Sequence, residues 1–382
     1  MGSKKIMLIL RIWSCRIFSF LPIYLFGTFT VCIPRKILQL EISETAFSYI
    51  ILTFGLAMIV SIQFCRIVLM PRLGTLHLMP IGGLLFSINF YFWTSANDYL
   101  SFLLLAFPAG IFFGLVSPPA NVETFRLEGE TGKILFPIFE AFMSLGVLMG
   151  ALTSGFLLSQ GFQPGEIFSY VSLIVGLLSI FFIIITNLKF TIMPTQKTGL
   201  KFPDKAVILP GVIAALVYAT YGIVVDWSAH WLSTEYKVSA FIAGIIIYFF
   251  SGTELLALLL GSKLLKYFGE KMIAFHGMLF GCFILLACLL SGDVYLIGLA
   301  FGIFGFFTAN FHPILMRITG RLEVLNREDA IGDVNLMSFA GFIVGPPIIG
   351  FIGESYGLTY CMFALPVLWI FCAALIRPKL VE

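Results

Sequence analysis

The chain is built from apolar stretches of about 20 residues that alternate with short polar segments. A stretch of that length can cross a bilayer as a helix, and the backbone of a segment in lipid must be hydrogen-bonded within the segment. We find no ten-residue alternation of apolar and polar positions, which would indicate a membrane barrel. The sequence therefore predicts an all-α membrane protein. Its twelve predicted transmembrane helices are 12–34, 46–65, 76–96, 99–122, 134–158, 167–187, 206–227, 239–262, 272–290, 294–316, 331–353 and 358–376.

The second half of the chain repeats the first at a constant offset of 195 residues. Seven glycines coincide at this offset, where composition alone predicts about two coincidences. Asp98 coincides with Asp293, and Pro118 with Pro313. The tripeptide Arg126-Leu127-Glu128 recurs as Arg321-Leu322-Glu323. The paired glycines are Gly27 and Gly222, Gly74 and Gly269, Gly82 and Gly277, Gly110 and Gly305, Gly146 and Gly341, Gly150 and Gly345, and Gly155 and Gly350. We therefore predict two fused six-helix bundles, 1–188 and 206–382, joined by a loop at 189–205.

Composition places this protein in lipid. Hydrophobic residues make up 59% of the 382 residues, charged residues only 11%, and the mean hydropathy is +1.03. Soluble domains carry about 25% charged residues, so this chain cannot cover a water-facing surface. Arg11 and Arg16 interrupt the apolar N-terminal stretch, which predicts an uncleaved first span rather than a signal peptide. We expect an integral multi-pass protein of the bacterial cytoplasmic membrane.

Motifs for enzyme chemistry are missing from the sequence. The seven cysteines are scattered and form neither a disulfide framework nor a metal-binding spacing. We find no glycine-rich phosphate loop and no HExxH or CxxC pattern. The sequence therefore predicts no catalytic residue, metal or cofactor and no nucleic-acid partner, and it argues against an enzyme or an ATP-driven pump.

The positive charges indicate an orientation. If the N-terminus is inside, the inside segments hold 20 of the 23 lysines and arginines, and the outside loops hold 3. Cytoplasmic loops carry the excess of lysine and arginine. We therefore predict that both termini and the central loop are cytoplasmic.

Two acids lie deep within apolar spans. Glu140 is in the fifth span and Glu254 in the eighth, where a charge costs about 3 kcal/mol. Asn335 occupies the repeat position of Glu140, so this pair is asymmetric. A structural hydrogen bond would explain each acid, and so would a proton-coupling or cation-binding role. We predict proton coupling for one of the two.

Hydroxyl, amide and imidazole groups lie in the first, seventh and tenth predicted spans. Helical spacing puts Tyr24 and Thr28 on one face, and Tyr218 and Tyr221 on another. Asn310 and His312 precede Pro313, a residue that bends helices. Such groups can fill a core or bind a polar solute. The predicted substrate-binding residues are Tyr24, Thr28, Tyr218, Tyr221, Asn310 and His312.

Two further motifs have a packing and a functional interpretation. The GxxxG pairs, Gly146 with Gly150 and Gly341 with Gly345, let helices approach closely. They could also form a smooth interface on which the halves rock. Asp226, Trp227 and Ser228 end the seventh span, either as interfacial residues or as part of an outer gate.

The twelve spans, the duplication and the central loop resemble the major facilitator superfamily. Asp226–Leu232 and Gly345–Gly350 are similar to motifs of a bacterial subgroup that includes a rhizopine-associated membrane protein. Asn121 followed by Glu128, and the segment Phe139–Gly146, match the same subgroup. The resemblance covers nearly the whole chain.

The resemblance also shows departures. The subgroup usually has His at Glu140. In the loop between spans 2 and 3, Arg72 and Gly74 are kept, but Pro71 takes the place of an aspartate and Thr75 that of a basic residue. The repeat of this loop keeps Gly269 but has Lys266 where the acid would be. The predicted gating residues are Arg72, Gly74, Asn121, Glu128, Asp226 and Trp227.

The resemblance implies that spans 1, 4, 7 and 10 surround a central cavity and that the protein works by alternating access. No lysine or arginine lies in the middle of a span, which argues against an anionic solute. We predict a proton-coupled secondary transporter, expected to be monomeric, for a neutral or cationic sugar, polyol or amino-cyclitol. The alternatives are a drug or metabolite exporter of the same fold and a non-transporting sensor or scaffold, and the altered loop between spans 2 and 3 is the reason to retain the second.

Overall fold

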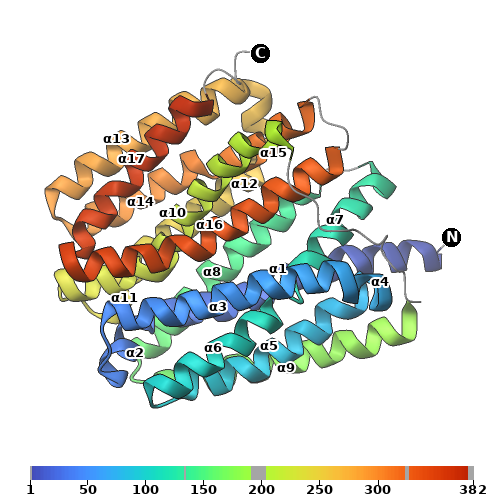
Figure 1. Ribbon diagram of the computed structural model, residues 1–382, viewed down its shortest axis with the longest axis horizontal. Helices are drawn as coiled ribbons and strands as arrows, with labels where there is room; N and C mark the ends of the chain where they lie inside the picture. The colour runs from blue at the N-terminus through green and yellow to red at the C-terminus, as the bar shows by residue number, and fades with distance from the viewer. Residues whose placement is uncertain (1, 133–134, 191–203, 323–326, 377–382) are drawn as a thin grey trace. The chain divides into compact units, whose positions relative to one another are not determined.

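The computed structural model describes residues 2–132, 135–190, 204–322 and 327–376 (Figure 1). Within these residues the chain forms helices and no strand. Most of the predicted central loop, 189–205, lies outside the described residues. Contacts between Cα atoms divide the chain into two compact units. Unit 1 comprises Met1–Arg35 and Thr53–Leu200, and unit 2 comprises Lys36–Leu52 and Lys201–Glu382. The two-bundle boundaries given by the repeat remain a prediction.

Unit 1 holds the helices of the first half of the chain, except the segment Lys36–Leu52. α1 packs against α8, and α5 packs against α9 (Figure 1). α3 begins in unit 2 and continues in unit 1. The elements up to the central loop are α1 (Gly2–Thr30), α2 (Ile33–Leu40), α3 (Glu44–Phe64), the π-helix η1 (Cys65–Leu69), α4 (Met70–Leu73), α5 (Thr75–Ser95), α6 (Tyr99–Phe113), α7 (Ser117–Thr131), α8 (Phe136–Ser159) and α9 (Pro164–Lys189).

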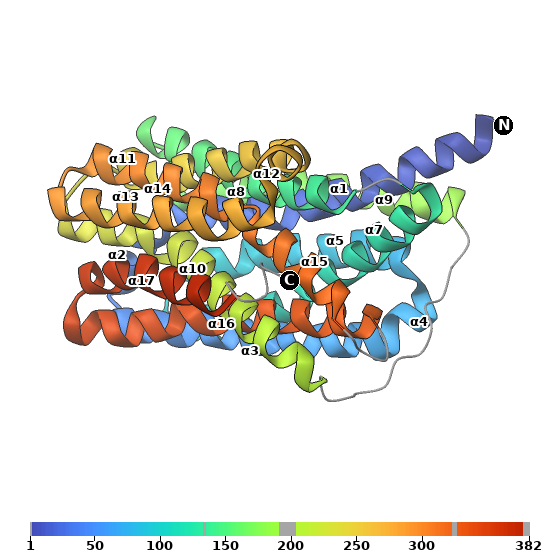
Figure 2. The same ribbon diagram turned by 90° about the horizontal axis from the view of Figure 1, so that it is seen from above.

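Unit 2 repeats this arrangement. α10 packs against α16 (Figure 2), and α13 packs against α17. Its elements after the central loop are α10 (Lys205–Glu235), α11 (Ala240–Ala243), α12 (Ile245–Lys271), the π-helix η2 (Met272–Gly277), α13 (Met278–Ser291), α14 (Val294–Thr308), α15 (Phe311–Arg321), α16 (Arg327–Tyr356) and α17 (Leu358–Ile376).

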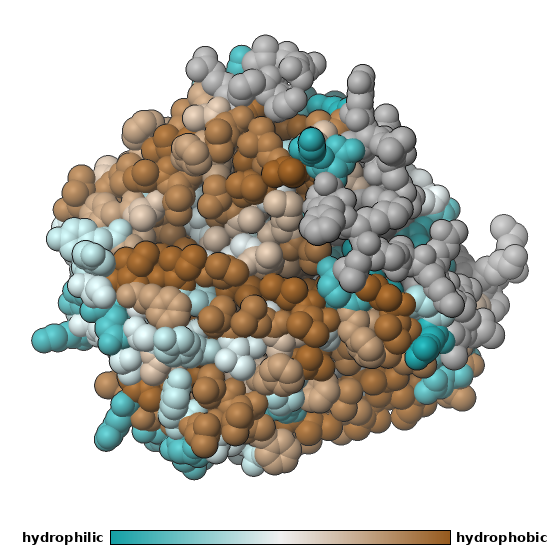
Figure 3. All heavy atoms as spheres, viewed as in Figure 1, coloured by the Kyte–Doolittle hydropathy of each residue, from teal (hydrophilic) through white to brown (hydrophobic). Residues whose placement is uncertain are grey.

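The helices are long and apolar enough for a membrane. Among the described residues, 11 helices could span a bilayer, and the shorter apolar helix Ile245–Gly261 lies where the eighth span is predicted. On the face shown in Figure 3, hydrophobic side chains cover the middle of the helices and hydrophilic ones gather toward the ends. These findings confirm an all-α, multi-pass integral membrane protein. The count of twelve spans and the side of the termini stay predictions.

The paired glycines pack equivalent helices in the two units. A Cβ atom on Gly146 would lie 2.8 Å from the carbonyl oxygen of Phe20 on α1. A Cβ atom on Gly341 would meet the carbonyl oxygen of Ala215 on α10. Phe20 and Ala215 are themselves one repeat apart. The structure therefore supports the close-packing interpretation of both GxxxG pairs, within each unit.

The turn that follows the second span is also kept in both copies. Gly74 has φ 71° and ψ 165°, and Gly269 has φ 76° and ψ 164°. This left-handed region favours glycine, because a Cβ atom is strained there. The backbone of the turn is thus retained although Pro71 has replaced the expected acid.

Equivalent aspartates begin α6 and α14. Asp98 accepts a hydrogen bond from the Ser101 amide at 2.8 Å, and Asp293 accepts from the amides of Tyr295 and Leu296. Such a cap satisfies an otherwise unpaired helix N–H group. The amide of Ser101 also lowers the pKa of the exposed Asp98 carboxyl.

Spans 4 and 10 are each broken near the repeated proline. α6 ends at Phe113 and α7 begins at Ser117, while α14 ends at Thr308 and α15 begins at Phe311. Pro118 and Pro313 lack the N–H group that would continue the helix hydrogen bonds, which favours a break in the preceding turn. Asn310 therefore stands at the residue before α15, at a break, where the sequence places it inside a span.

All seven cysteines lie in the described residues as free thiols. Cys288 on α13 is partly exposed, and the other six are buried.

Candidate functional site

Three helices of unit 2 meet at His312. Tyr218 on α10 places its hydroxyl 3.4 Å from His312 Nδ1, and the two ring centroids are 4.7 Å apart. On the other side of the imidazole, Ser338 Oγ on α16 lies 3.5 Å from Nε2. The structure thus brings together two residues that the sequence proposes separately. Ser338 was missed, since a single serine in an apolar helix gives no signal.

Tyr221 lies one turn beyond Tyr218 and contacts Glu254. Its hydroxyl is hydrogen-bonded to the Glu254 carboxylate on α12. Phe250 and Phe342 flank the Tyr221 ring, with centroids 5.7 and 6.2 Å away. An acid inside a span needs such a partner, because a lone charge in lipid is costly. Tyr218, Tyr221, Glu254, His312 and Ser338 form one polar cluster in unit 2, which we call the tyrosine–histidine cluster.

Asn310 makes a helix-to-helix contact. Its side-chain Nδ2 donates to the carbonyl oxygen of Ala257 on α12 at 3.0 Å, and the residue is buried. Its Oδ1 lies where a Cβ atom on Gly261 would stand. This contact ties the break before α15 to α12. Its role toward a solute stays a prediction.

In unit 1, Tyr24 and Thr28 lie at the contact of α1 with α8. The Tyr24 hydroxyl donates to Thr153 Oγ1 at 3.4 Å. Thr28 is fully buried, and its hydroxyl donates to the Tyr24 carbonyl oxygen at 2.8 Å. A Cβ atom on Gly150 would stand 2.7 Å from the Thr28 amide nitrogen. Thr28 is buried because α1 and α8 pack closely at this position.

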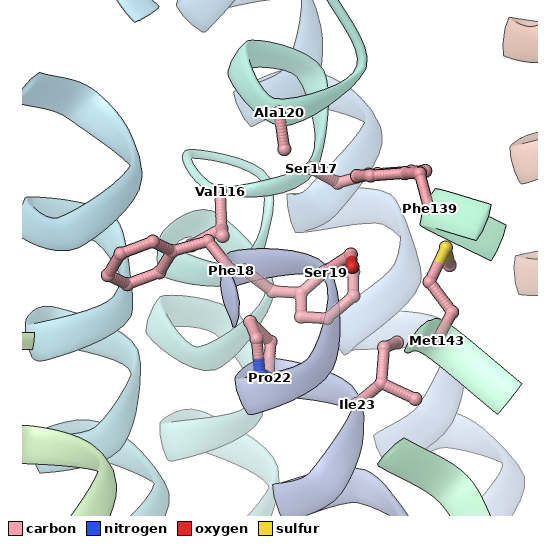
Figure 4. A pocket seen from close by; sticks show the side chains of 10 residues that line it. Phe18, Ser19, Pro22, Ile23, Val116, Ser117, Ala120, Phe139 and Met143 are labelled. Atoms are coloured by element: carbon pink, nitrogen blue, oxygen red, sulfur yellow. The ribbon is translucent and has the colours of Figure 1, made fainter. Parts of the chain in front are cut away.

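A pocket of about 260 Å³, counting open space at its mouth, lies in unit 1 between α1, α7 and α8 (Figure 4). Ser19 and Ser117 are the hydroxyl-bearing residues of an otherwise apolar lining. Phe139 and Met143 line its wall on α8, and Glu140 follows Phe139 directly in the chain. Glu140 is partly buried. The remaining lining residues are Phe18, Pro22, Ile23, Phe113, Val116 and Ala120.

A network of charges ties α1 to α7 and to the start of α5. Arg11 Nε donates to Glu123 at 2.7 Å, and the other Arg11 nitrogens donate to Glu130 at 2.7 and 2.9 Å. Thr75, next to Gly74, donates to the second Glu123 oxygen at 2.6 Å. The Glu123 side chain is only 2% exposed. The sequence did not single out this network, because the residues that bond to each other are 48 to 119 positions apart in the chain.

The predicted gating residues of unit 1 do not form one group. Arg72 is exposed on α4, and Asn121 is partly buried on α7. The Glu128 carboxylate accepts a hydrogen bond from the Leu135 amide at 2.5 Å, which joins the end of α7 to the start of α8. Their gating role stays a prediction.

The two motifs behind the family resemblance contact each other in unit 2. Trp227 is fully buried, and its Nε1 donates to the Pro346 carbonyl oxygen at 2.8 Å. A Cβ atom on Gly350 would stand 2.7 Å from the Trp227 ring. Asp226 is partly exposed, and we find no hydrogen bond or ion pair for it within the described ranges.

A second ionisable pair lies in unit 2, at the first turn of α3. His230 Nε2 is 3.2 Å from Glu44 Oε1, and Glu354 on α16 accepts from the Thr45 amide at 2.8 Å. Glu44 Oε2 and His230 Nδ1 are buried, and no hydrogen-bond partner is found for either among the residues the structure covers. Nothing in the sequence distinguishes this pair from ordinary helix-end residues.

The sequence of this chain is similar to that of one known protein family. Residues 207–381 match the model of the Major Facilitator Superfamily. An uncharacterized MFS-type transporter of Yersinia pestis is 22% identical over 350 residues, which cover 90% of this chain and 89% of that protein. The chain is therefore similar to the major facilitator superfamily, by the family model over its second half and by relatives over most of its length. The membrane protein MosC of Rhizobium meliloti is 24% identical over 296 residues, 75% of this chain and 70% of MosC.

Solved structures of superfamily members share the fold. The crystal structure of a D-xylose-proton symporter superposes with a TM-score of 0.70 at 13% identity, covering 97% of this chain and 98% of the symporter. The chain thus has the major facilitator fold that the sequence predicts. Proteins of this superfamily are transporters, so the likeness indicates a transporter, with a small-molecule substrate and a lipid bilayer as partners, and not an enzyme.

Proposed function

We propose that this protein is a proton-coupled secondary transporter of a small neutral or cationic hydroxylated solute, such as a sugar, polyol or amino-cyclitol. The tyrosine–histidine cluster carries this proposal. It combines hydroxyl, imidazole and carboxylate groups inside one unit and contains no lysine or arginine. Desolvating an anion without a fixed cation is costly, whereas a polyol finds directional hydrogen-bond partners here.

The arginines of the first span support the same solute class. Arg11 is engaged by Glu123 and Glu130. The Arg16 guanidinium lies over the rings of Trp13 and Phe142, at 5.2 and 5.8 Å from their centroids. Neither is an uncommitted cation for a phosphate or carboxylate. The D-xylose-proton symporter provides a precedent within the same fold for a neutral hydroxylated solute moved with protons.

Uptake by purified protein in proteoliposomes tests this function. With an inwardly directed proton gradient we expect saturable accumulation of at least one solute from a panel that includes D-xylose and myo-inositol. We expect none of succinate or glucose 6-phosphate. Saturable uptake of either anion, with the neutral solutes failing to compete, would contradict the proposal.

The coupling residue is tested in the same vesicles. Replacing the coupling acid by glutamine should abolish accumulation against a gradient and preserve exchange, because the carboxyl can no longer carry a proton. Glu254→Gln and Glu140→Gln are the two candidates. Glu235→Gln, an exposed acid at the end of α10, is the control and should behave as wild type. If both candidate variants still accumulate solute, neither acid is the coupler.

We also propose that both termini and the central loop are cytoplasmic, from the distribution of lysine and arginine. Alkaline phosphatase and green fluorescent protein fused at the C-terminus and at Lys197 test this orientation. Fluorescence without phosphatase activity is expected at both positions. Phosphatase activity at either position would contradict the proposed orientation.

A further inference from the structure

The hydrogen-bond direction in the tyrosine–histidine cluster can be followed outward from a backbone carbonyl. Ser338 Oγ lies 2.9 Å from the Val334 carbonyl oxygen, which can only accept, so the serine hydroxyl donates its proton there. Toward His312 the serine oxygen can then only accept. The proton of a neutral imidazole must therefore sit on Nε2, which faces Ser338.

This tautomer fixes the direction of the next hydrogen bond. With its proton on Nε2, neutral His312 presents a lone pair at Nδ1. The hydroxyl of Tyr218, 3.4 Å away, must then donate to Nδ1. A phenolic oxygen that donates its single proton to the protein can only accept from any other partner.

The hydroxyls of the other two tyrosines predicted to bind solute also donate their protons to the protein. Tyr221 donates to the Glu254 carboxylate, which can only accept when ionised. In unit 1, Thr153 donates to the Met149 carbonyl oxygen at 2.6 Å, so Tyr24 donates to Thr153. Thr28 and Asn310 likewise donate to backbone carbonyls, those of Tyr24 and Ala257.

We propose that Tyr218 and Tyr221 of the tyrosine–histidine cluster in unit 2 bind the solute as hydrogen-bond acceptors, so that the solute must offer hydroxyl or ammonium donors to them. This inference deepens the proposed function and rests on it for the location of the solute. Ser338 is a positioning residue, because it sets the tautomer of His312 and through it the direction of the Tyr218 hydroxyl. This hydrogen-bond direction excludes solutes that present only acceptors. The exclusion does not depend on the lack of lysine and arginine in the cluster.

The tautomer of His312 can be measured without any solute. The chain has four histidines, so full-length protein labelled with ¹⁵N-histidine in detergent micelles gives few ring signals, and His312→Gln identifies the relevant one. In alkaline buffer, where the ring is neutral, we expect the proton on Nε2. Ser338→Thr should keep this tautomer, and Ser338→Ala should lose the preference. A proton on Nδ1 in the wild type would overturn the inference whether or not the variants fold.

Counterflow provides the matching transport measurement, with myo-inositol and its mono-O-methyl ethers as probes. An O-methyl group keeps the acceptor oxygen and removes the donor. We expect at least one ether to compete about 10- to 100-fold less well than the parent, the penalty of an unmet buried hydrogen bond. Equal competition by every ether would overturn the inference. Absence of transport for every hydroxylated solute would instead overturn the proposed function. The inference about hydrogen-bond direction would then be decided by the measured tautomer of His312.

Discussion

Replacing Gly341 by leucine should displace α16 from α10 and strongly destabilise unit 2. A Cβ atom at this position would meet the carbonyl oxygen of Ala215, and a backbone atom cannot move aside as a side chain can. Overpacking a close contact costs about 1–3 kcal/mol or more, and here a whole helix must shift. We expect the apparent melting temperature in detergent to fall by at least about 5 °C.

Two further variants make this result specific. Gly146→Leu should have the same effect in unit 1, because a Cβ atom there approaches the Phe20 carbonyl oxygen. Gly129→Leu on α7 is the matched control, since no atom of the residues that the structure describes lies within 4 Å of its Cβ position. If Gly341→Leu melted like Gly129→Leu, the close approach of α16 to α10 would be wrong.

The second large effect concerns the charge network of unit 1. Arg11→Met should destabilise the protein by about 3–5 kcal/mol, because it leaves the buried Glu123 carboxylate without its main partner. Thr75 would still donate to Glu123, but Arg126 lies 3.9 Å away. Glu130→Gln should cost less than about 1 kcal/mol, because Glu130 is half exposed.

A double variant separates loss of the ion pair from loss of arginine packing. Arg11→Met with Glu123→Gln removes both charges, so it should be more stable than Arg11→Met alone. Denaturation of the four proteins in detergent should therefore rank wild type and Glu130→Gln first, the double variant next and Arg11→Met last. A double variant less stable than Arg11→Met would show that the buried carboxylate is not the source of the cost.

Most of the fold could be predicted from the sequence because lipid imposes a strong pattern. Each span must be a helix of about 20 apolar residues, so its presence is visible without any partner. The close helix packing at Gly146 and Gly341 could be predicted as well, because close backbone contacts tolerate only small residues and the glycines recur in both halves. The breaks before Ser117 and Phe311 were not located, since proline kinks a helix without fixing which preceding residue leaves it.

The polar contacts could be predicted only in part. Glu254 and His312 stand out because ionisable groups are rare in spans. Their partners Tyr221, Tyr218 and Ser338 come from segments far apart in the chain, and hydropathy contains no information about which polar groups meet. Glu123 was missed for a related reason, since it lies near a helix end, where charged residues are expected.

The burial of the cysteines bears on how motion in this protein could be observed. Six of the seven thiols are shielded by packed side chains, and only Cys288 near the end of α13 is partly exposed. A maleimide dye or spin label should therefore react first at Cys288. Removing that one thiol would give a background in which a pair of engineered surface cysteines could report distances by fluorescence transfer or electron resonance. The native core would stay intact, so conformational exchange could be followed before any solute is identified.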